Sequence, residues 1–201
     1  MQIREPSEAD LDALIAFFER VPESERTFFK EPVLDRATVE GWLTGERGRR
    51  GLALSDDGRV VGYVAVVCLT GWSDHVGEVR LVVDPAARGQ GLGRTLVAAL
   101  VDDARERGVE TLTLDVRGNN HAAMVLYESF GFQVVGRLPD FVAVGAERWD
   151  RVLYRLDLRS ADAPVRRHGA RPVGPGASSW RPPSRQPTFP GPPLSGPAAP
   201  A

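Results

Sequence analysis

The stretch from Glu78 to Gly93, EVRLVVDPAARGQGLG, is the most informative part of the sequence. Its first six residues alternate between two faces, with the period of two that is typical of a β-strand. Asp84 and Pro85 end this strand, because proline has no N–H to donate to a sheet and disfavours helix in the residue before it. A glycine-rich segment then leads into a helical pattern. The stretch therefore predicts a strand, a loop and a helix in succession.

The glycine-rich loop has the composition of an anion site. Glycine lets backbone N–H groups approach a ligand closely, and the following helix directs its positive end to the same place. Phosphate is the usual ligand of such a loop. The loop lacks the Gly-Lys-Ser/Thr of a Walker loop, and Gly89, Gly91 and Gly93 do not follow the G-x-G-x-x-G spacing of a dinucleotide-binding turn. We therefore expect a phosphate loop of another class.

A second informative stretch runs from Asn119 to Phe132, NNHAAMVLYESFGF. Asn119 or Asn120 is expected to cap a helix, because a side-chain oxygen at this position accepts from the first backbone N–H groups. Gly131 is expected to end the helix. Its apolar face follows the spacing i, i+3, i+4, i+7, in Ala123, Leu126, Tyr127 and Phe130.

The two stretches together resemble the GNAT superfamily of acetyl-CoA-dependent N-acetyltransferases. The first contains Arg-x-x-Gly-x-Gly at Arg88, Gly91 and Gly93. The second contains the pattern N-x-x-A-x-x-L-Y-x-x-x-G-F, at Asn120, Ala123, Leu126, Tyr127, Gly131 and Phe132. The resemblance covers about residues 3–158. It implies an α/β fold with a mixed, twisted sheet of about seven strands flanked by about four helices, whose fourth and fifth strands splay apart to admit the cofactor.

Sequence patterns also predict how the chain is organised. Residues 1–158 are expected to form the N-acetyltransferase domain, and 159–201 a disordered tail rich in Pro, Arg and Gly that has little apolar surface to bury. A loop is expected over 21–32 and a turn over 138–147. Strands are expected at about 2–5, 52–55, 59–69, 78–83, 111–116, 132–138 and 148–158, and helices at about 8–20, 36–43, 92–107 and 120–130.

The resemblance implies which residues hold acetyl-CoA. The loop backbone would bind the pyrophosphate, with two arginines adding charge, and the strand before it would pair with the pantetheine arm. The helix cap of the second stretch would also contact the cofactor. The residues concerned are Leu81, Val82, Val83, Arg88, Gly89, Gln90, Gly91, Leu92, Gly93, Arg94, Asn120 and Ala123.

The resemblance also implies catalytic groups. Tyr127 matches the tyrosine that protonates the leaving thiolate, although by periodicity alone it is a core-facing aromatic. Glu78 lies where many GNAT enzymes carry the base, and it could instead be an ordinary salt-bridged strand residue. His75 is the rival base, since its pKa lies near neutrality. Because His75 and Glu78 point to opposite faces of a regular strand, no metal site is expected. Cys68, in an apolar strand, is expected to be an inert hydrophobe rather than a nucleophile.

Composition sets the remaining expectations. The 201 residues carry a net charge of −2, one cysteine and no apolar run of membrane-spanning length, so we expect a cytoplasmic protein without a membrane or nucleic-acid partner. The predicted function is acetyl transfer to a primary amine, which could belong to a small molecule, a protein N-terminus or a lysine. A non-catalytic acyl-CoA-binding module, a nucleic-acid-binding tail and a homodimer remain alternatives.

Overall fold

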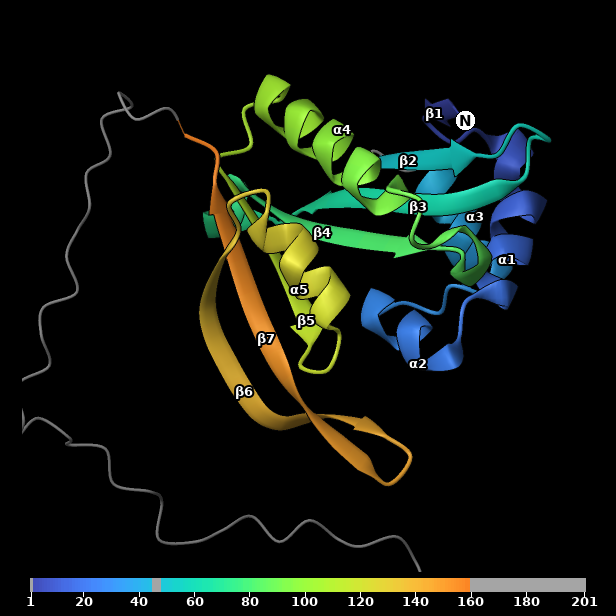
Figure 1. Ribbon diagram of the computed structural model, residues 1–201. Coiled ribbons are helices and arrows are strands. Elements are labelled where there is room, and N and C mark those ends of the chain that lie inside the picture. The colour runs from blue at the N-terminus through green and yellow to red at the C-terminus, as the bar shows by residue number, and fades with distance from the viewer. Residues whose placement is uncertain (1, 45–47, 160–201) are drawn as a thin grey trace, which may run out of the picture. The chain divides into compact units, whose positions relative to one another are not determined.

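The computed structural model describes residues 2–44 and 48–159, and all of these belong to one compact unit. They form a sheet of seven strands in the order β1-β2-β3-β4-β5-β7-β6 (Figure 1). β4 and β5 run parallel, whereas the other neighbours are antiparallel. The predicted mixed sheet is confirmed. The bounds are β1 Gln2–Arg4, β2 Arg49–Leu54, β3 Val60–Cys68, β4 Val76–Val83, β5 Thr111–Arg117, β6 Gln133–Val144 and β7 Glu147–Asp157.

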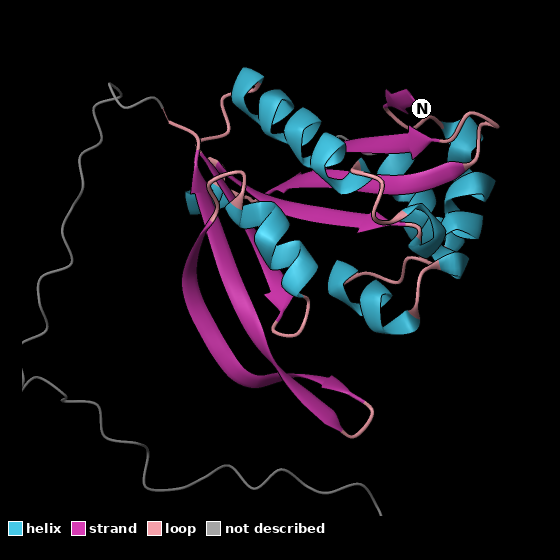
Figure 2. Ribbon diagram, in the orientation of Figure 1, coloured by secondary structure: helices cyan, strands magenta, loops and turns pink. Residues whose placement is uncertain are grey.

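Helices cover both faces of the sheet (Figure 2). One core contains the apolar stripe of α4 and Tyr127 of α5, and the other contains the buried residues of α1 and α3. The α-helices of the described residues are α1 Leu11–Arg20, α2 Glu23–Arg26, α3 Arg36–Thr44, α4 Leu92–Glu106 and α5 His121–Glu128. The short 3-10 helices are η1 Glu8–Asp10, η2 Thr27–Phe29, η3 Gly71–Ser73 and η4 Pro85–Ala87.

Two local expectations are corrected. The segment 21–32 is not a plain loop, because it contains the single turn of α2 and the 3-10 turn η2. Pro22 precedes that turn, where its missing N–H removes no helical hydrogen bond. Cys68 is the last residue of β3 and is exposed rather than packed in the apolar interior. The prediction for β3 itself is confirmed, since it is buried on both faces from Val60 to Val66.

The stretch from Glu78 to Gly93 belongs to a β4–α4–β5 unit, as the sequence predicts. The two parallel strands pair only at Val76 with Thr111, Gly77 with Leu112 and Glu78 with Thr113. Beyond this point they diverge, and Figure 1 shows β5 turning away from β4. Each strand is held on its other side, β4 by β3 and β5 by β7 over its full length. The sheet therefore has an opening between β4 and β5, and each of the two strands stays hydrogen-bonded to its other neighbour.

The last hairpin differs from its prediction. The segment 138–147 is not a turn, because β6 continues to Val144 and pairs again with β7 after a register shift between Leu138 and Val142. Pro139 lies in that irregularity, where proline is tolerated in a strand. Asp140, beside it, has a φ of 54°. The proline and aspartate therefore mark a bulge. The predicted tail, apart from Arg159, lies outside the described residues.

Candidate active site

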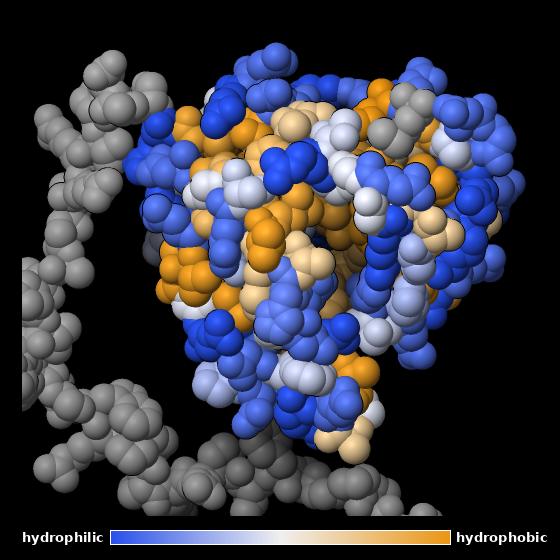
Figure 3. All heavy atoms as spheres, viewed as in Figure 1, coloured by the Kyte–Doolittle hydropathy of each residue, from blue (hydrophilic) through white to orange (hydrophobic). Residues whose placement is uncertain are grey.

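A cleft of about 950 Å³ opens where β4 and β5 diverge. Its walls come from the second half of β4, the loop and start of α4, the end of β5, α5, and the segment that contains α2 and η2. Figure 3 shows the hollow near the centre of one face. The cleft therefore contacts both faces of the sheet, which allows two ligands to meet within it.

β4 supplies the long wall of the cleft. Leu81, Val82 and Val83 line it as predicted for a cofactor-binding strand. The ladder with β5 ends at Glu78, so the backbone groups on the β5-facing edge beyond it are left for another hydrogen-bonding partner. An extended, amide-containing arm would satisfy such groups as an added strand does.

The glycine loop lies at the carboxyl end of β4, between η4 and α4. Gly89 has a φ of 76° and Gly91 a φ of 82°, the left-handed region that favours glycine. Apart from the adjacent residues, no described atom lies within 4 Å of where a Cβ would stand at either position, so the backbone surface is open. Gly91 is the N-cap of α4, whose first N–H groups and positive dipole favour an anion.

Most predicted cofactor residues line this cleft. Those that do are Leu81, Val82, Val83, Arg88, Gly89, Gly91, Leu92, Gly93, Arg94, Asn120 and Ala123. Gln90 is exposed and is not among the lining residues. A role for Gln90 would be limited to its backbone.

The two arginines of the loop have protein partners. Arg88 donates to both carboxylate oxygens of Glu25 at 3.1 and 2.6 Å and to the carbonyl oxygen of Val83 at 3.1 Å. Arg94 donates to Ser129 Oγ at 3.2 Å and lies over the ring of Phe130. Both guanidinium groups are therefore oriented beside the loop, and Arg88 also ties α2 to it.

α5 brings Asn120 and Tyr127 to the cleft. Asn120 is the N-cap, and its side chain accepts from the backbone N–H of Ala123 at 3.2 Å. Tyr127 lies seven residues, or about two helical turns, after Asn120. Its ring packs edge-on against Phe132, with ring centroids 5.5 Å apart. Burial raises the pKa of Tyr127, so its hydroxyl stays protonated at neutral pH. A protonated hydroxyl can donate a hydrogen bond.

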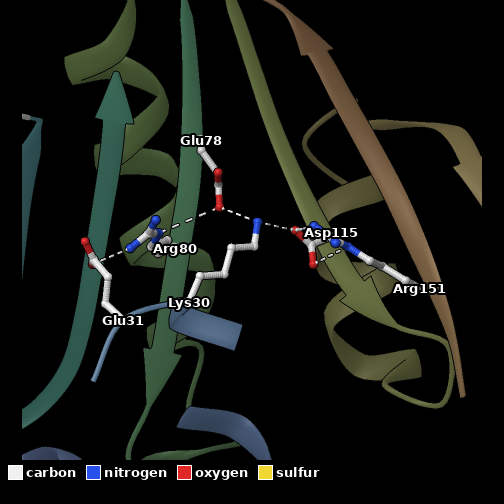
Figure 4. A network of polar contacts seen from close by, with 6 residues as sticks. All are labelled: Lys30, Glu31, Glu78, Arg80, Asp115 and Arg151. Carbon is white, nitrogen blue, oxygen red and sulfur yellow. Dashed lines mark hydrogen bonds and ion pairs between the residues drawn. The ribbon is translucent and has the colours of Figure 1, made fainter. Parts of the chain in front are cut away.

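A polar network occupies the opposite face of β4 and β5. Glu78 and Asp115 stand on the two diverging strands, and Lys30 Nζ lies between them, 2.8 Å from Glu78 Oε1 and 3.2 Å from Asp115 Oδ1 (Figure 4). Arg80 donates to Glu31 at 2.5 Å, and Arg151 donates to Asp115 at 2.9 Å. The network collects charged side chains of both signs at the point where the strands part.

The rival residues lie elsewhere. His75 is exposed, its Nδ1 lies 3.8 Å from Asp74 Oδ1, and it is not among the residues that line the cleft, whereas Glu78 is. Cys68 does not line it either. Among the described residues, no group of three or more His, Cys, Asp and Glu side chains could hold a metal ion. No helix in the described part of the chain is long and apolar enough to cross a membrane.

Sequence reasoning missed Lys30 and Asp115. Asp115 lies on the polar face of β5, two residues beyond Thr113, which pairs with Glu78, so recognition of the parallel register could have found it. Lys30 is the single lysine of the chain, but nothing in its sequence neighbourhood indicates a contact with β4. Only the folded chain brings these residues together.

The chain is similar to a family of known proteins. A model described as "Acetyltransferase (GNAT) family" matches residues 13–132, which is more than half of the chain. The [ribosomal protein bS18]-alanine N-acetyltransferase of Escherichia coli (strain K12) is 54% identical over 85 residues, covering 42% of this chain and 57% of the relative. The L-methionine sulfoximine/L-methionine sulfone acetyltransferase of Salmonella typhimurium is 28% identical over 172 residues, covering 82% and 98%.

A solved structure shares the fold. The phosphinothricin acetyltransferase of Sinorhizobium meliloti, in complex with AcCoA, superposes with a TM-score of 0.71 at 22% identity, covering 85% of this chain and 95% of that one. The first curated relatives are matched over only part of their length, 34% of one and 57% of another. The likeness at this level of identity concerns the fold.

Proposed function

We propose that this chain, which belongs to the acetyltransferase (GNAT) family, transfers an acetyl group from acetyl-CoA to a primary amine. One observation carries the proposal. A single cleft connects the glycine loop, Tyr127 on one face of the sheet and Glu78 on the other. A donor that enters from the loop and an amine that enters from the opposite face would meet between these two side chains.

The donor site follows from the backbone. The N–H groups at the start of α4 and the open glycine loop would hold the CoA pyrophosphate, with Arg88 and Arg94 beside it. The pantetheine arm would then extend along Leu81–Val83 and pair with the free edge of β4. This places the thioester toward Glu78, where the two strands join.

The chemistry requires two proton transfers. Glu78 would accept a proton from the acceptor ammonium, directly or through water, so that the amine can attack the thioester carbonyl. The tetrahedral intermediate would collapse with cleavage of the carbon–sulfur bond, and Tyr127 would protonate the departing thiolate. Direct transfer in a ternary complex needs no covalent enzyme intermediate.

The acceptor is an amine of undetermined identity. One relative is named for the alanine of a ribosomal protein and another for a free amino-acid analogue, so peptide N-termini and small amines are both reasonable acceptors to test. Specificity resides in loops that vary on a common fold. We further propose a cytoplasmic location and a catalytic domain that ends near Leu158.

The test is release of free thiol from acetyl-CoA in the presence of small amines, amino acids and peptides. We expect turnover with one class of acceptor, and Glu78→Gln and Tyr127→Phe should each reduce kcat while acetyl-CoA still binds. Arg105→Gln, on the exposed side of α4, is the matched control. Tight binding without turnover across the panel would favour a non-catalytic acyl-CoA-binding module, and no binding at all would refute the proposal.

A further inference from the structure

The side chain of Lys30 ends in a primary amine, the group that we propose as the acceptor. Lys30 is the only lysine among the 201 residues, and its Nζ donates to Glu78 Oε1 at 2.8 Å and lies 3.2 Å from Asp115 Oδ1 (Figure 4). Both carboxylates line the cleft. A primary ammonium thus contacts the carboxylate proposed as the base, and Lys30 itself is not among the residues that line the cleft.

The donor arm would end at the same place. Glu78 and Thr113 form the last pair of the β4–β5 ladder, and the glycine loop lies beyond the other end of β4. From Glu78 to Val83 the strand makes five steps of roughly 3.3 Å, so this edge spans about 17 Å. An arm that runs from the loop along this edge brings the thioester to the junction where Lys30 Nζ lies.

The backbone fixes Lys30 there. Phe29, the preceding residue, is 3% exposed and packs edge-on against Phe18 at 5.2 Å. Lys30 itself has a φ of 58°, an uncommon conformation for a residue other than glycine that surrounding structure must hold in place. Its side chain remains 39% exposed. The anchored aromatic therefore fixes the backbone from which the lysine side chain extends, while part of that side chain stays exposed.

We propose that Lys30 is an internal acceptor and that the protein acetylates its Nζ, an inference that rests on the proposed function. Glu78 takes a proton from the Lys30 ammonium, and the amine attacks the acetyl carbonyl of acetyl-CoA. The carbon–sulfur bond breaks, an amide bond forms, and the thiolate receives a proton. The products are Nε-acetyl-Lys30, CoA thiol and one proton released to solvent.

Acetylation would also change the network. It removes the positive charge that bridges Glu78 and Asp115, and with it both ion pairs. Asp115 keeps Arg151, and Glu78 keeps Arg80 at 3.7 Å. The modified protein would therefore present two carboxylates to an external ammonium without competition from Lys30.

The experiment incubates the full chain with acetyl-CoA and follows intact mass, with tandem mass spectrometry to locate the acetyl group. We expect acetyl-Lys30 to form at least ten times faster in the wild type than in Glu78→Gln or in the urea-unfolded chain. Lys30→Arg keeps the charge and should abolish the modification. Peptide mapping separates Lys30 from the α-amine of Met1, and thermal melting establishes that each variant is folded.

Two further measurements separate this inference from the proposed function. Acetyl-CoA binding and thiol release with external amines are measured on the same samples. External turnover with an unmodified Lys30, or acetylation that is equally fast in Glu78→Gln and the unfolded chain, would overturn the inference and leave the proposed function intact. Loss of acetyl-CoA binding altogether would overturn both.

Discussion

Arg88 and Glu25 form a bidentate ion pair beside the glycine loop, with Arg88 Nη2 2.6 Å from Glu25 Oε2. The carboxylate of Glu25 thus pairs with the guanidinium group of Arg88, which we expect to contact the CoA pyrophosphate. Glu25 belongs to α2, the turn that precedes Phe28, Phe29 and Lys30. We therefore expect acetyl-CoA binding and the position of the segment that contains α2 and η2 to be connected through Arg88.

This contact predicts opposite effects of two substitutions on acetyl-CoA binding. Arg88→Gln removes a cation from the proposed phosphate site, and we expect the Kd for acetyl-CoA to rise about tenfold. This corresponds to about 1.4 kcal/mol, near the lower end of what a hydrogen bond to a charged group contributes. Glu25→Gln removes the competing anion, so the Kd should fall about twofold to fivefold. Isothermal titration at fixed salt measures both. Equal Kd values for the wild type and both variants would contradict the contact's role.

The conformation of Gly91 predicts a coupled loss of stability and binding. Alanine in the left-handed region costs about 1 to 2 kcal/mol, and Gly91 forms the N-cap of α4 inside the proposed phosphate site. We expect Gly91→Ala to lower the free energy of unfolding by about that amount and to weaken acetyl-CoA binding. Urea unfolding and titration with acetyl-CoA report the two effects.

Gly58 is the matched control for this prediction. It has a φ of 80° in the β2–β3 hairpin and, like Gly91, has no described atom within 4 Å of a built Cβ. Gly58→Ala should therefore lose similar stability and keep the acetyl-CoA affinity of the wild type. An affinity loss in both variants would mean that stability alone explains the effect.

Tyr127→Phe should reduce kcat by about 100-fold, the lower end of what general acid catalysis contributes where the leaving group needs a proton. The KM for acetyl-CoA should change little. Because burial raises the pKa of Tyr127, its acid form persists above the ordinary tyrosine pKa of about 10, and activity should show no alkaline loss from this group below that pH.

Tyr63→Phe is the control for Tyr127. Tyr63 is also buried, in the core on the α1 side, and its hydroxyl accepts from Arg50 Nε at 3.2 Å. Burial raises its pKa to about 12. It does not line the cleft. Its removal should leave kcat unchanged, and a comparable loss in both variants would refute a specific role for Tyr127.

The contacts of Asp10 predict how the free energy of unfolding changes as the pH becomes acidic. Arg4 donates to both of its carboxylate oxygens, at 2.7 and 2.6 Å, and Ser7 N donates at 2.7 Å. These donors, Arg4 foremost, hold the pKa of Asp10 well below its ordinary value. The stabilisation is complete above the unfolded pKa of about 3.9 and is lost as the pH falls below it.

Asp10→Asn should lower the free energy of unfolding at pH 7 by about 1 to 2 kcal/mol and reduce the acid-dependent loss below about pH 4. Urea unfolding between pH 2 and 7 measures both effects. Asp12→Asn, whose side chain is 83% exposed, is the control and should change stability by less than about 0.5 kcal/mol. A pH-independent difference between wild type and Asp10→Asn would contradict the linkage.

Much of the fold could be predicted because its signals are local. The alternation over Glu78–Val83, the left-handed glycines of the loop and the Asn120 cap each express a requirement of a few consecutive residues. The errors arose where local signals are ambiguous. Pro139 and Asp140 are typical of a turn, but they form a bulge because the chain pairs again with β7 beyond them.

Neighbouring residues are enough to specify the β4–loop–α4 unit, the α5 cap and the motifs of an acetyltransferase, since backbone conformation and side-chain period are local properties. The folded chain was needed to see where the β4–β5 ladder stops, that Glu25 pairs with Arg88, and that Lys30 lies between Glu78 and Asp115. Those contacts join residues 48 to 85 positions apart. They depend on how the segment that contains α2 and η2 packs beside the glycine loop, β4 and β5, which short-range patterns do not encode.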